Sequence, residues 1–253
     1  YGGGVYCEGR FIMNGGTIRD CTAFTAGAIE YLGKTPLTLN GKIIAGSNDI
    51  TGHPDPGVTG NTISISGVSN LILGDKADIQ ADISVSICTI HANGGVVKGN
   101  ICSYSESTVR VDEGVSGGTI IYGQIRGSYI SVDGPAVTYK VNGEDYAVQV
   151  LRSGSLATRP IEPTKTGYEF DGWYKDGTKW DYNTAVTENI TLAGYLSLPV
   201  ASESELENAL ADDTVDAIKL KDNTNINIPL EITRAVILDL NGYILKMTSN
   251  IRV

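Results

Sequence analysis

The stretch Leu-Thr-Leu-Asn-Gly-Lys-Ile-Ile, residues 37–44, decides the fold of this 253-residue chain. An apolar-x-apolar strand runs into an Asn-Gly turn, and a second apolar strand follows. The same template occurs as Phe-Ile-Met-Asn-Gly-Gly-Thr-Ile at residues 11–18, and Leu-x-Leu-Asn-Gly-x-Ile occurs again at residues 238–244. Residues 3–6 are echoed by residues 27–30, which gives the first repeat a period of about 24–26 residues.

Looser echoes of this template continue to residue 132, as short apolar strands with Gly, Asn or Asp at nearly every corner. Such strands, with almost no helical periodicity, predict an all-β fold in which residues 1–134 form a right-handed parallel β-helix. Stacked coils, about 4.8 Å apart, share one aliphatic core that no single coil could bury alone. An antiparallel sandwich is the alternative, disfavoured because each repeat carries about three strand pieces rather than a hairpin pair.

Asparagine at the predicted corners has two physical roles. It tolerates left-handed backbone angles, and its side chain can stack on a counterpart in the next coil. The corner residues of this kind are Asn14, Asn40, Asn93, Asn142 and Asn241. The glycine-rich pattern of residues 1–50 also resembles the β-helical repeats of bacterial surface and adhesin-like proteins.

The middle of the chain is richer in aromatic residues. Alternating apolar positions on both sides of Asn142-Gly143 predict a β-hairpin. Downstream, Gly-Tyr-Glu-Phe-Asp-Gly-Trp-Tyr at residues 167–174 is followed by Trp180. These rings would supply the core of a small domain, since each buries about 150–250 Å². The alternative is an exposed aromatic shelf that binds sugar, formed by Tyr168, Trp173, Tyr174 and Trp180.

The order of these aromatic residues resembles the Listeria–Bacteroides repeat, the internalin-type B-repeat of bacterial surface proteins. The motif residues are Gly167, Tyr168, Phe170, Gly172, Trp173 and Tyr174. The resemblance implies a compact β-grasp-like domain over residues 135–198 that acts as a spacer or a weak interaction module. The sequence departs from the family pattern at residues 193–196, where Ala-Gly-Tyr-Leu replaces an aromatic-rich last strand.

Residues 199–253 begin with a helix signal. Ser202 and Glu205 form a capping-box pattern, and an apolar face follows, which predicts a short capping helix near residues 203–211. Strand-like alternation then leads into the template at residues 238–244, so we expect the first coils of a second β-helical segment. A helix before the first coil covers an open sheet edge. The arrangement resembles the start of pectin-lyase-like β-helices.

Composition excludes several classes of partner. A net charge of −10 disfavours nucleic acid, and no 18-residue apolar run is present that would insert into a membrane. The chain starts at Tyr1 inside a repeat, so we expect neighbouring domains of a longer chain. The cysteines have no CxxC or His-containing spacing that indicates zinc, and we expect neither a metal nor a cofactor. Spacing leaves open whether disulfides or buried thiols form at Cys7, Cys21, Cys88 and Cys102.

Catalytic motifs were sought because pectin-lyase-like folds include lyases and hydrolases. The polygalacturonase motifs are absent, and the single Asp-Asp, Asp212-Asp213, follows the expected helix. His53 lies in a turn-rich loop and His91 at a strand end, and neither has a recognisable catalytic context. Acidic residues could bind calcium weakly, although a solvated acidic face is the default. They are Asp75, Asp78, Asp112 and Glu113.

These patterns together predict a non-enzymatic bacterial cell-surface or secreted protein, an adhesive or structural stalk that binds host or environmental glycans or proteins. The alternative is a carbohydrate-active β-helix enzyme, a lyase or hydrolase, whose catalytic coils lie outside these residues. A third hypothesis makes the B-repeat a specific protein-binding module that the β-helices space apart.

Overall fold

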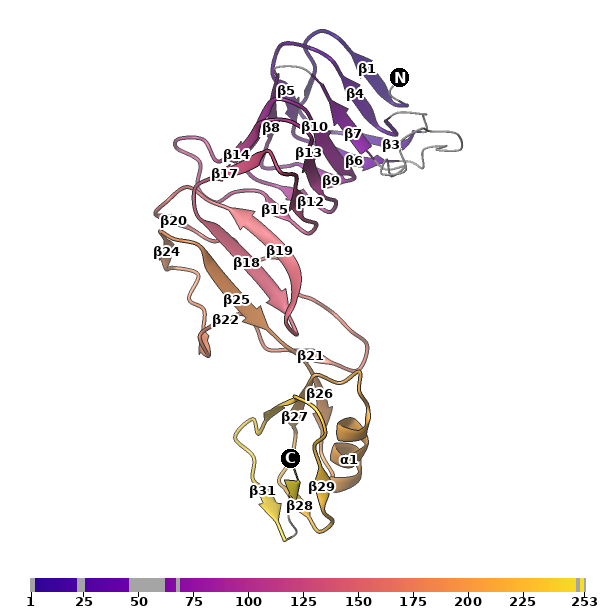
Figure 1. Ribbon diagram of the computed structural model, residues 1–253, viewed down its shortest axis with the longest axis vertical. Coiled ribbons are helices and arrows are strands. Elements are labelled where there is room, and N and C mark those ends of the chain that lie inside the picture. The colour runs from indigo at the N-terminus through magenta and orange to yellow at the C-terminus, as the bar shows by residue number, and fades with distance from the viewer. Residues whose placement is uncertain (1–2, 22–25, 46–61, 67–68, 249–250, 253) are drawn as a thin grey trace. The chain divides into compact units, whose positions relative to one another are not determined.

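The computed structural model describes residues 3–21, 26–45, 62–66, 69–248 and 251–252 (Figure 1). The described residues form an all-β structure with one helix, α1 (Glu203–Ala211), which confirms the predicted fold class. The chain divides into two compact units. The first contains residues 1–138, 146–160 and 181–191, and the second contains residues 139–145, 161–180 and 192–253.

The first unit contains a parallel β-helix. In it, each strand pairs with the strand three places further along the chain, so that β1 pairs with β4 and β4 with β7. The first face contains β1 (Val5–Cys7), β4 (Ile29–Tyr31), β7 (Thr62–Ile65), β10 (Asp82–Val85), β13 (Ile101–Ser103) and β16 (Ile125–Arg126). The second face contains β2 (Ile12–Met13), β5 (Leu37–Leu39), β8 (Ser69–Leu73), β11 (Cys88–Ala92), β14 (Ser107–Arg110) and β17 (Ile130–Asp133). The third face contains β3 (Thr17–Cys21), β6 (Lys42–Ala45), β9 (Asp78–Gln80), β12 (Val96–Val97) and β15 (Ile120–Ile121). We call each circuit of three strands a coil, and the set of coils the first stack.

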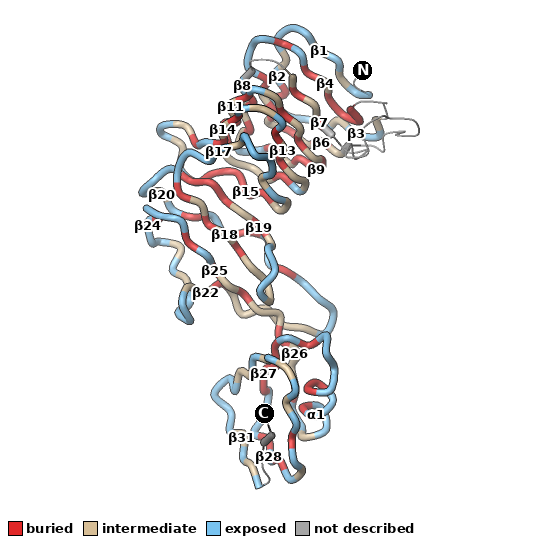
Figure 2. Tube along the Cα trace, viewed as in Figure 1, coloured by how far each residue is buried: buried red, intermediate tan, exposed pale blue. Residues whose placement is uncertain are grey.

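The core of the first stack is a ladder of aliphatic side chains in register. On the first face, Ile29 pairs with Ile63, Ile63 with Ile83, and Ile83 with Ile101. All four side chains are fully buried, and Figure 2 shows buried and half-buried positions alternating along these strands. Identical positions in successive coils therefore share one apolar interior, since alternate residues of a strand point to the same side of the sheet.

Coil length varies more than the sequence repeat predicted. Asp82 and Asn100 are hydrogen-bonded 18 residues apart in adjacent coils, whereas Ile29 pairs with Ile63, 34 residues later. The longest coil includes residues 46–61, which lie outside the described part of the chain. The predicted period of about 24–26 residues is confirmed for the first coil, where Val5 pairs with Ile29, Ile12 with Thr38 and Thr17 with Lys42, while the coil lengths after it vary and the strands still pair in register.

The asparagine corners use two different geometries. Asn142 and Asn241 have φ of 51° and 50°, the left-handed backbone that the pattern predicts. Asn40 and Asn93 are not among the described residues with positive φ. Instead, Asn40 Oδ1 accepts a hydrogen bond from the Lys76 backbone N–H at 2.7 Å, and Asn93 Oδ1 accepts one from the Asp112 N–H at 3.0 Å. Asn14 also lacks a positive φ, because the glycines at 15 and 16 take the left-handed positions there.

The third face of the first stack ends on an antiparallel strand. β19 (Glu144–Val150) follows β18 (Ala136–Val141), and Ile120 and Ile121 of β15 pair with Gln149 and Val148. Gln149 is fully buried, donates from Nε2 to the Gly118 carbonyl at 3.0 Å, and accepts at Oε1 from the Thr158 N–H at 2.9 Å. Beside it, β20 (Ser155–Leu156) pairs with β24 (Ala185–Val186). β19 covers the edge of β15, which would otherwise be open to pairing with another strand.

The second unit contains a shorter parallel stack, which we call the second stack. Before this stack, the second unit includes the antiparallel strands β21 (Glu169–Phe170), β22 (Tyr174–Lys175) and β23 (Thr178–Lys179), and the end of β25 (Ile190–Gly194). The strands of the second stack are β26 (Leu196–Val200), β27 (Ala217–Leu220), β28 (Thr224–Ile226), β29 (Leu230–Glu231), β30 (Ile237–Asp239), β31 (Leu245–Met247) and β32 (Ile251–Arg252). β27, β28 and β29 pair in parallel with β30, β31 and β32. β26 pairs in parallel with β27 and antiparallel with β21, so the second stack begins on β26. The predicted boundaries at residues 134 and 198 remain predictions.

Helix α1 lies between β26 and β27 and spans the predicted residues. Ser202 Oγ accepts a hydrogen bond from the Glu205 N–H at 3.3 Å, while Glu205 Oε2 accepts from the Ala201 N–H at 2.7 Å. The carboxylate thus reaches the residue before the N-cap rather than the N-cap itself. Leu206, Ala209 and Leu210 are buried against the strands of the second stack.

Candidate functional site

The aromatic residues predicted either to fill a core or to bind sugar are not on an exposed shelf. Trp173 is 2% exposed and packs edge-on against Tyr139 and Phe170, at centroid distances of 4.9 and 5.1 Å. Tyr168, Tyr174 and Trp180 are half-buried. Lys165 Nζ also lies 3.8 Å above the Tyr168 ring.

Glycines explain two features of this motif. Gly167 and Gly172 have φ of 82° and 110°, conformations that a side chain would strain. At Gly194, in the segment that departs from the family pattern, an added Cβ would lie 2.5 Å from the Phe170 ring and 3.1 Å from Trp173. The last strand therefore lacks a side chain there because the aromatic core occupies that space.

The acidic residues of the motif form ion pairs within the second unit. Lys219 Nζ donates to both oxygens of Asp171, at 2.6 and 2.5 Å, and Lys221 Nζ donates to Glu169 at 3.0 and 3.2 Å. Burial lowers the pKa of Lys219, but the hydrogen bond and charge of Asp171, with Asp239 and Glu169, outweigh it and raise the pKa overall. These contacts are a structural clamp between the motif and β27.

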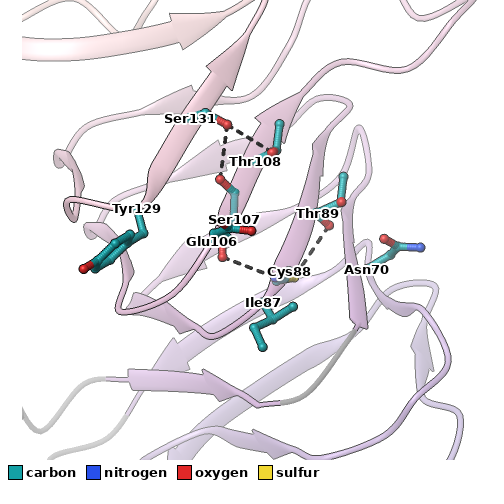
Figure 3. Close-up of a pocket in the computed structure, with 9 residues that line it drawn as sticks. All are labelled: Asn70, Ile87, Cys88, Thr89, Glu106, Ser107, Thr108, Tyr129 and Ser131. Carbon is teal, nitrogen blue, oxygen red and sulfur yellow. Dashed lines mark hydrogen bonds between the residues drawn. The ribbon is translucent and has the colours of Figure 1, made fainter.

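A groove lies on the second face of the first stack. Its volume is about 540 Å³, and it crosses β8, β11, β14 and β17 (Figure 3). The residues that line it are Asn70, Ile87, Cys88, Thr89, Glu106, Ser107, Thr108, Tyr129 and Ser131. The groove runs across the strands, so each strand contributes to a different part of its length.

The floor of the groove is a row of polar side chains in register. Asn70 pairs with Thr89, Thr89 with Thr108, and Thr108 with Ser131. The Thr108 and Ser131 hydroxyl oxygens are 3.0 Å apart, and Ser131 Oγ donates to the Ser107 carbonyl at 3.3 Å. Strand spacing places the backbones that carry these groups about 4.8 Å apart along the stack. A repeating row of hydroxyl and amide groups can hydrogen-bond a ligand that itself repeats.

The rim of the groove consists of corner residues from successive coils. Ile87 is 49% exposed with φ of 52°, and Tyr129 is 63% exposed. A left-handed backbone at a β-branched residue costs about 1–3 kcal/mol and persists where the surrounding structure enforces it, often at ligand sites. An exposed tyrosine beside hydroxyl groups offers an apolar ring face and a polar end.

Among the residues that line the groove, one side chain carries a formal charge. Glu106 is exposed and is the only lining residue with a formal charge. Burial raises the pKa of the Cys88 thiol to about 11, so this cysteine is neutral near pH 7 and a poor nucleophile. The lining therefore supplies hydrogen-bonding groups, one aromatic ring and one carboxylate.

The two histidines and the acidic residues considered from the sequence lie elsewhere. His53 is outside the described residues. His91 is 9% exposed, and its Nδ1 lies 2.6 Å from Asp112 Oδ1, while Asn93 Nδ2 donates to Asp112 Oδ2 at 2.9 Å. Burial raises the pKa of Asp112, but the hydrogen bonds from Asn93 and His91 and the charges of His91 and Arg110 lower it overall. This cluster joins two adjacent coils.

The other residues that could coordinate a metal ion lie apart from one another. Asp78 pairs with Lys42 and Lys98, both at 3.4 Å, and among the described residues no group of three or more His, Cys, Asp or Glu is placed to hold a metal ion. Cys7, Cys21, Cys88 and Cys102 are all free thiols. No helix in the described part of the chain is long and apolar enough to cross a membrane.

Sequence reasoning missed the groove. The Thr and Ser residues of its floor alternate with apolar residues as in any strand, and the unequal coil lengths hide their alignment. The pairing register is the signal that could have identified them, and it became visible only with the structure.

Comparison with known proteins bears on the middle of the chain. Residues 136–193 match the Listeria-Bacteroides repeat domain family. Internalin H of Listeria monocytogenes serovar 1/2a (strain ATCC BAA-679 / EGD-e) is 37% identical over 67 residues, which are 24% of this chain and 12% of that protein. A putative membrane protein of Evansella cellulosilytica is 36% identical over 67 residues, 24% of this chain and 10% of that protein. The chain thus matches only about a tenth of the length of these curated relatives. The predicted B-repeat is confirmed for residues 136–193 by the family match.

Proposed function

We propose that this chain is part of a bacterial cell-surface or secreted protein, where it serves as an adhesive stalk that binds glycans. The observation that carries the proposal is the groove, in which Thr89, Thr108 and Ser131 present hydroxyl groups in register beside the exposed ring of Tyr129. Sugars match such a surface, because their hydroxyl groups pair with polar side chains and their C–H faces pack on aromatic rings.

The location at the cell surface is supported by the B-repeat. Internalin H and a putative membrane protein are among the proteins to which part of this chain is similar. The parallel stacks favour a structural role, because each coil contacts only its neighbours and coils can be added without limit.

The groove lining favours binding of a glycan without its hydrolysis. Glycoside hydrolysis generally requires two carboxyl groups about 5–10 Å apart, and the groove lining contains one, Glu106. His91 is directed to Asp112 rather than being part of that lining. The carbohydrate-active enzyme predicted as the alternative is an outcome of the test below.

A glycan array, run with and without calcium and followed by product analysis of each hit, tests the proposal. We expect at least one glycan to bind without release of products. Tyr129→Ala should weaken that binding about fivefold, because loss of one aromatic contact removes on the order of 1 kcal/mol.

Tyr104→Ala is the matched control. Tyr104 is 68% exposed at a corner of the same stack but does not line the groove, so its removal should leave binding unchanged. Release of oligosaccharides would replace the proposal with the enzyme alternative. Absence of any hit, or equal losses in the two variants, would refute the groove as a glycan site.

A further inference from the structure

The charge of the groove narrows its ligand class. Glu106 has no ion pair with a described residue, and the basic side chains nearest to the groove in sequence are engaged elsewhere. Arg110 Nε lies 3.8 Å from Asp112, and Arg126 Nε donates to Gln124 at 2.8 Å. A ligand in the groove therefore meets an uncompensated carboxylate and no cation from the lining.

The other groups in the lining do not alter the net negative charge of the groove. The Cys88 thiol is uncharged because burial raises its pKa to about 11, and the remaining side chains are amide, hydroxyl, phenol or aliphatic. The chain as a whole has a net charge of −10, so the surrounding field adds to the repulsion of anions. Charge complementarity thus favours a cationic ligand and disfavours a uronate.

We propose that the groove selects linear glycans that carry free amino groups, and that Glu106 is the residue that selects them. This inference rests on the proposed glycan-binding function of the same groove. The sugar amine, as an ammonium group, donates to the Glu106 carboxylate, while the sugar hydroxyl groups lie along the floor formed by Thr89, Thr108 and Ser131 and one ring face packs on Tyr129.

The size of the effect follows from the exposure of Glu106. Two unit charges about 4 Å apart in bulk water interact strongly enough for about a fivefold change in affinity, and more where the ligand excludes water. Salt should reduce the preference, since exposed charges are screened at physiological ionic strength.

Titration calorimetry with three probes tests the proposal. The probes are a glucosamine hexamer, the N-acetylglucosamine hexamer that has the same backbone without the charge, and a galacturonic acid hexamer. At pH 6 and low salt, we expect the wild-type chain to bind the amino hexamer at least fivefold more tightly than the acetylated one, and the uronate most weakly. Glu106→Gln should equalise the first two by weakening only the amino probe.

Glu113→Gln is the control for a general effect of net charge. The Glu113 side chain is 93% exposed and lies outside the groove lining, so this variant removes the same charge and should retain the preference. Equal loss in both variants, a preference that survives Glu106→Gln, or tighter binding of the uronate would overturn the selectivity. If only uncharged glycans bind, and do so in a Tyr129-dependent way, the selectivity fails while the glycan-binding function stands. If no glycan binds, both fail.

Discussion

The first and second stacks contain the same sequence template in very different surroundings. In the first stack, Leu39 and Ile43 are fully buried, whereas in the second stack the residues at the same template positions, Leu240 and Ile244, are 41% and 65% exposed. Leu39 pairs with Leu73 of the following coil, while β30, just before Leu240, pairs only with β27 among the described strands. The template encodes strand, turn and strand, but burial depends on a neighbouring coil on each side.

The second stack has other sources of stability. α1 buries Leu206 and Leu210 against its strands, and two carboxylates of the B-repeat motif accept hydrogen bonds from Lys219 and Lys221. The helix and these ion pairs help to offset the conformational entropy of ordering the strands of the second stack.

The sharpest test of this comparison is truncation of the same template position in both stacks. Leu39→Ala should destabilise the first unit by about 2–5 kcal/mol, because it leaves a cavity in a close-packed core. Leu240→Ala should cost less than about 0.5 kcal/mol, because the side chain is already partly in water. Guanidinium unfolding of both variants measures the difference.

An equal loss in the two variants would break the comparison. It would mean that Leu240 is covered in solution, by further residues or by a second copy of the chain. Thr38→Ala, a half-buried position in the same strand as Leu39, controls for effects of mutation in β5.

The ion pairs of the second unit provide the next largest effect. Lys219→Met should destabilise this unit by about 1.5–3 kcal/mol, because Lys219 is 8% exposed and its removal leaves Asp171 without its partner. Lys221→Met should cost about 0.2–1 kcal/mol, since that side chain is 41% exposed and its pair with Glu169 is screened by water.

The pH dependence of the Lys219 pair has a defined sign. The folded state raises the pKa of Lys219 above its usual value of 10.5, so the stabilisation is complete below that pH and is lost as the pH rises further. Alkaline unfolding curves of the wild type and Lys219→Met should therefore converge. Curves that stay parallel above pH 10.5 would show that Lys219 acts through its packing rather than its charge.

The sequence predicted the strands, the helix and the B-repeat motif better than it predicted the contacts that surround them. The strand template, the helix at 203–211 and the B-repeat motif are local patterns, and each was recognisable from its own residues. The groove and the Lys219–Asp171 pair join residues in different coils or segments, and their alignment depends on loop lengths that no local pattern fixes. The buried state of Trp173 also depends on Tyr139 and on the space left by Gly194, far from it in the chain.

Acid should affect the first stack through Asp112. The folded state lowers the pKa of this carboxyl below 3.8, so its contribution is present above that pH and is lost as the pH falls through the folded value. Asp112→Asn should destabilise the first unit by about 1 kcal/mol at pH 7, since one charge-assisted network is lost, and should flatten the acid dependence of its stability.

Glu113→Gln is the neighbouring control. Its side chain is 93% exposed, so the variant should retain the acid dependence of the wild type. Thermal unfolding between pH 3 and pH 7 distinguishes the two. The interpretation of Asp112 as a clamp between coils would be wrong if Asp112→Asn and the wild type lost stability in parallel on acidification.

The smallest effect concerns helix α1, which packs against the strands of the second stack. Ser202→Ala removes the acceptor for the Glu205 N–H and should cost about 0.5–1 kcal/mol, the lower part of the range for N-caps, because the hydrogen bond is 3.3 Å long. Ser204→Ala is the control: Ser204 is exposed within α1, and alanine has a higher helix propensity, so this variant should be neutral or slightly stabilising. If α1 stabilises the second stack, hydrogen exchange at Ile218 and Leu220 of β27 should accelerate in Ser202→Ala and not in Ser204→Ala, because these strand residues share a buried cluster with Leu206. Faster exchange confined to the helix would mean that the second stack holds without its cap, and the contrast with the first stack would then rest on the ion pairs alone.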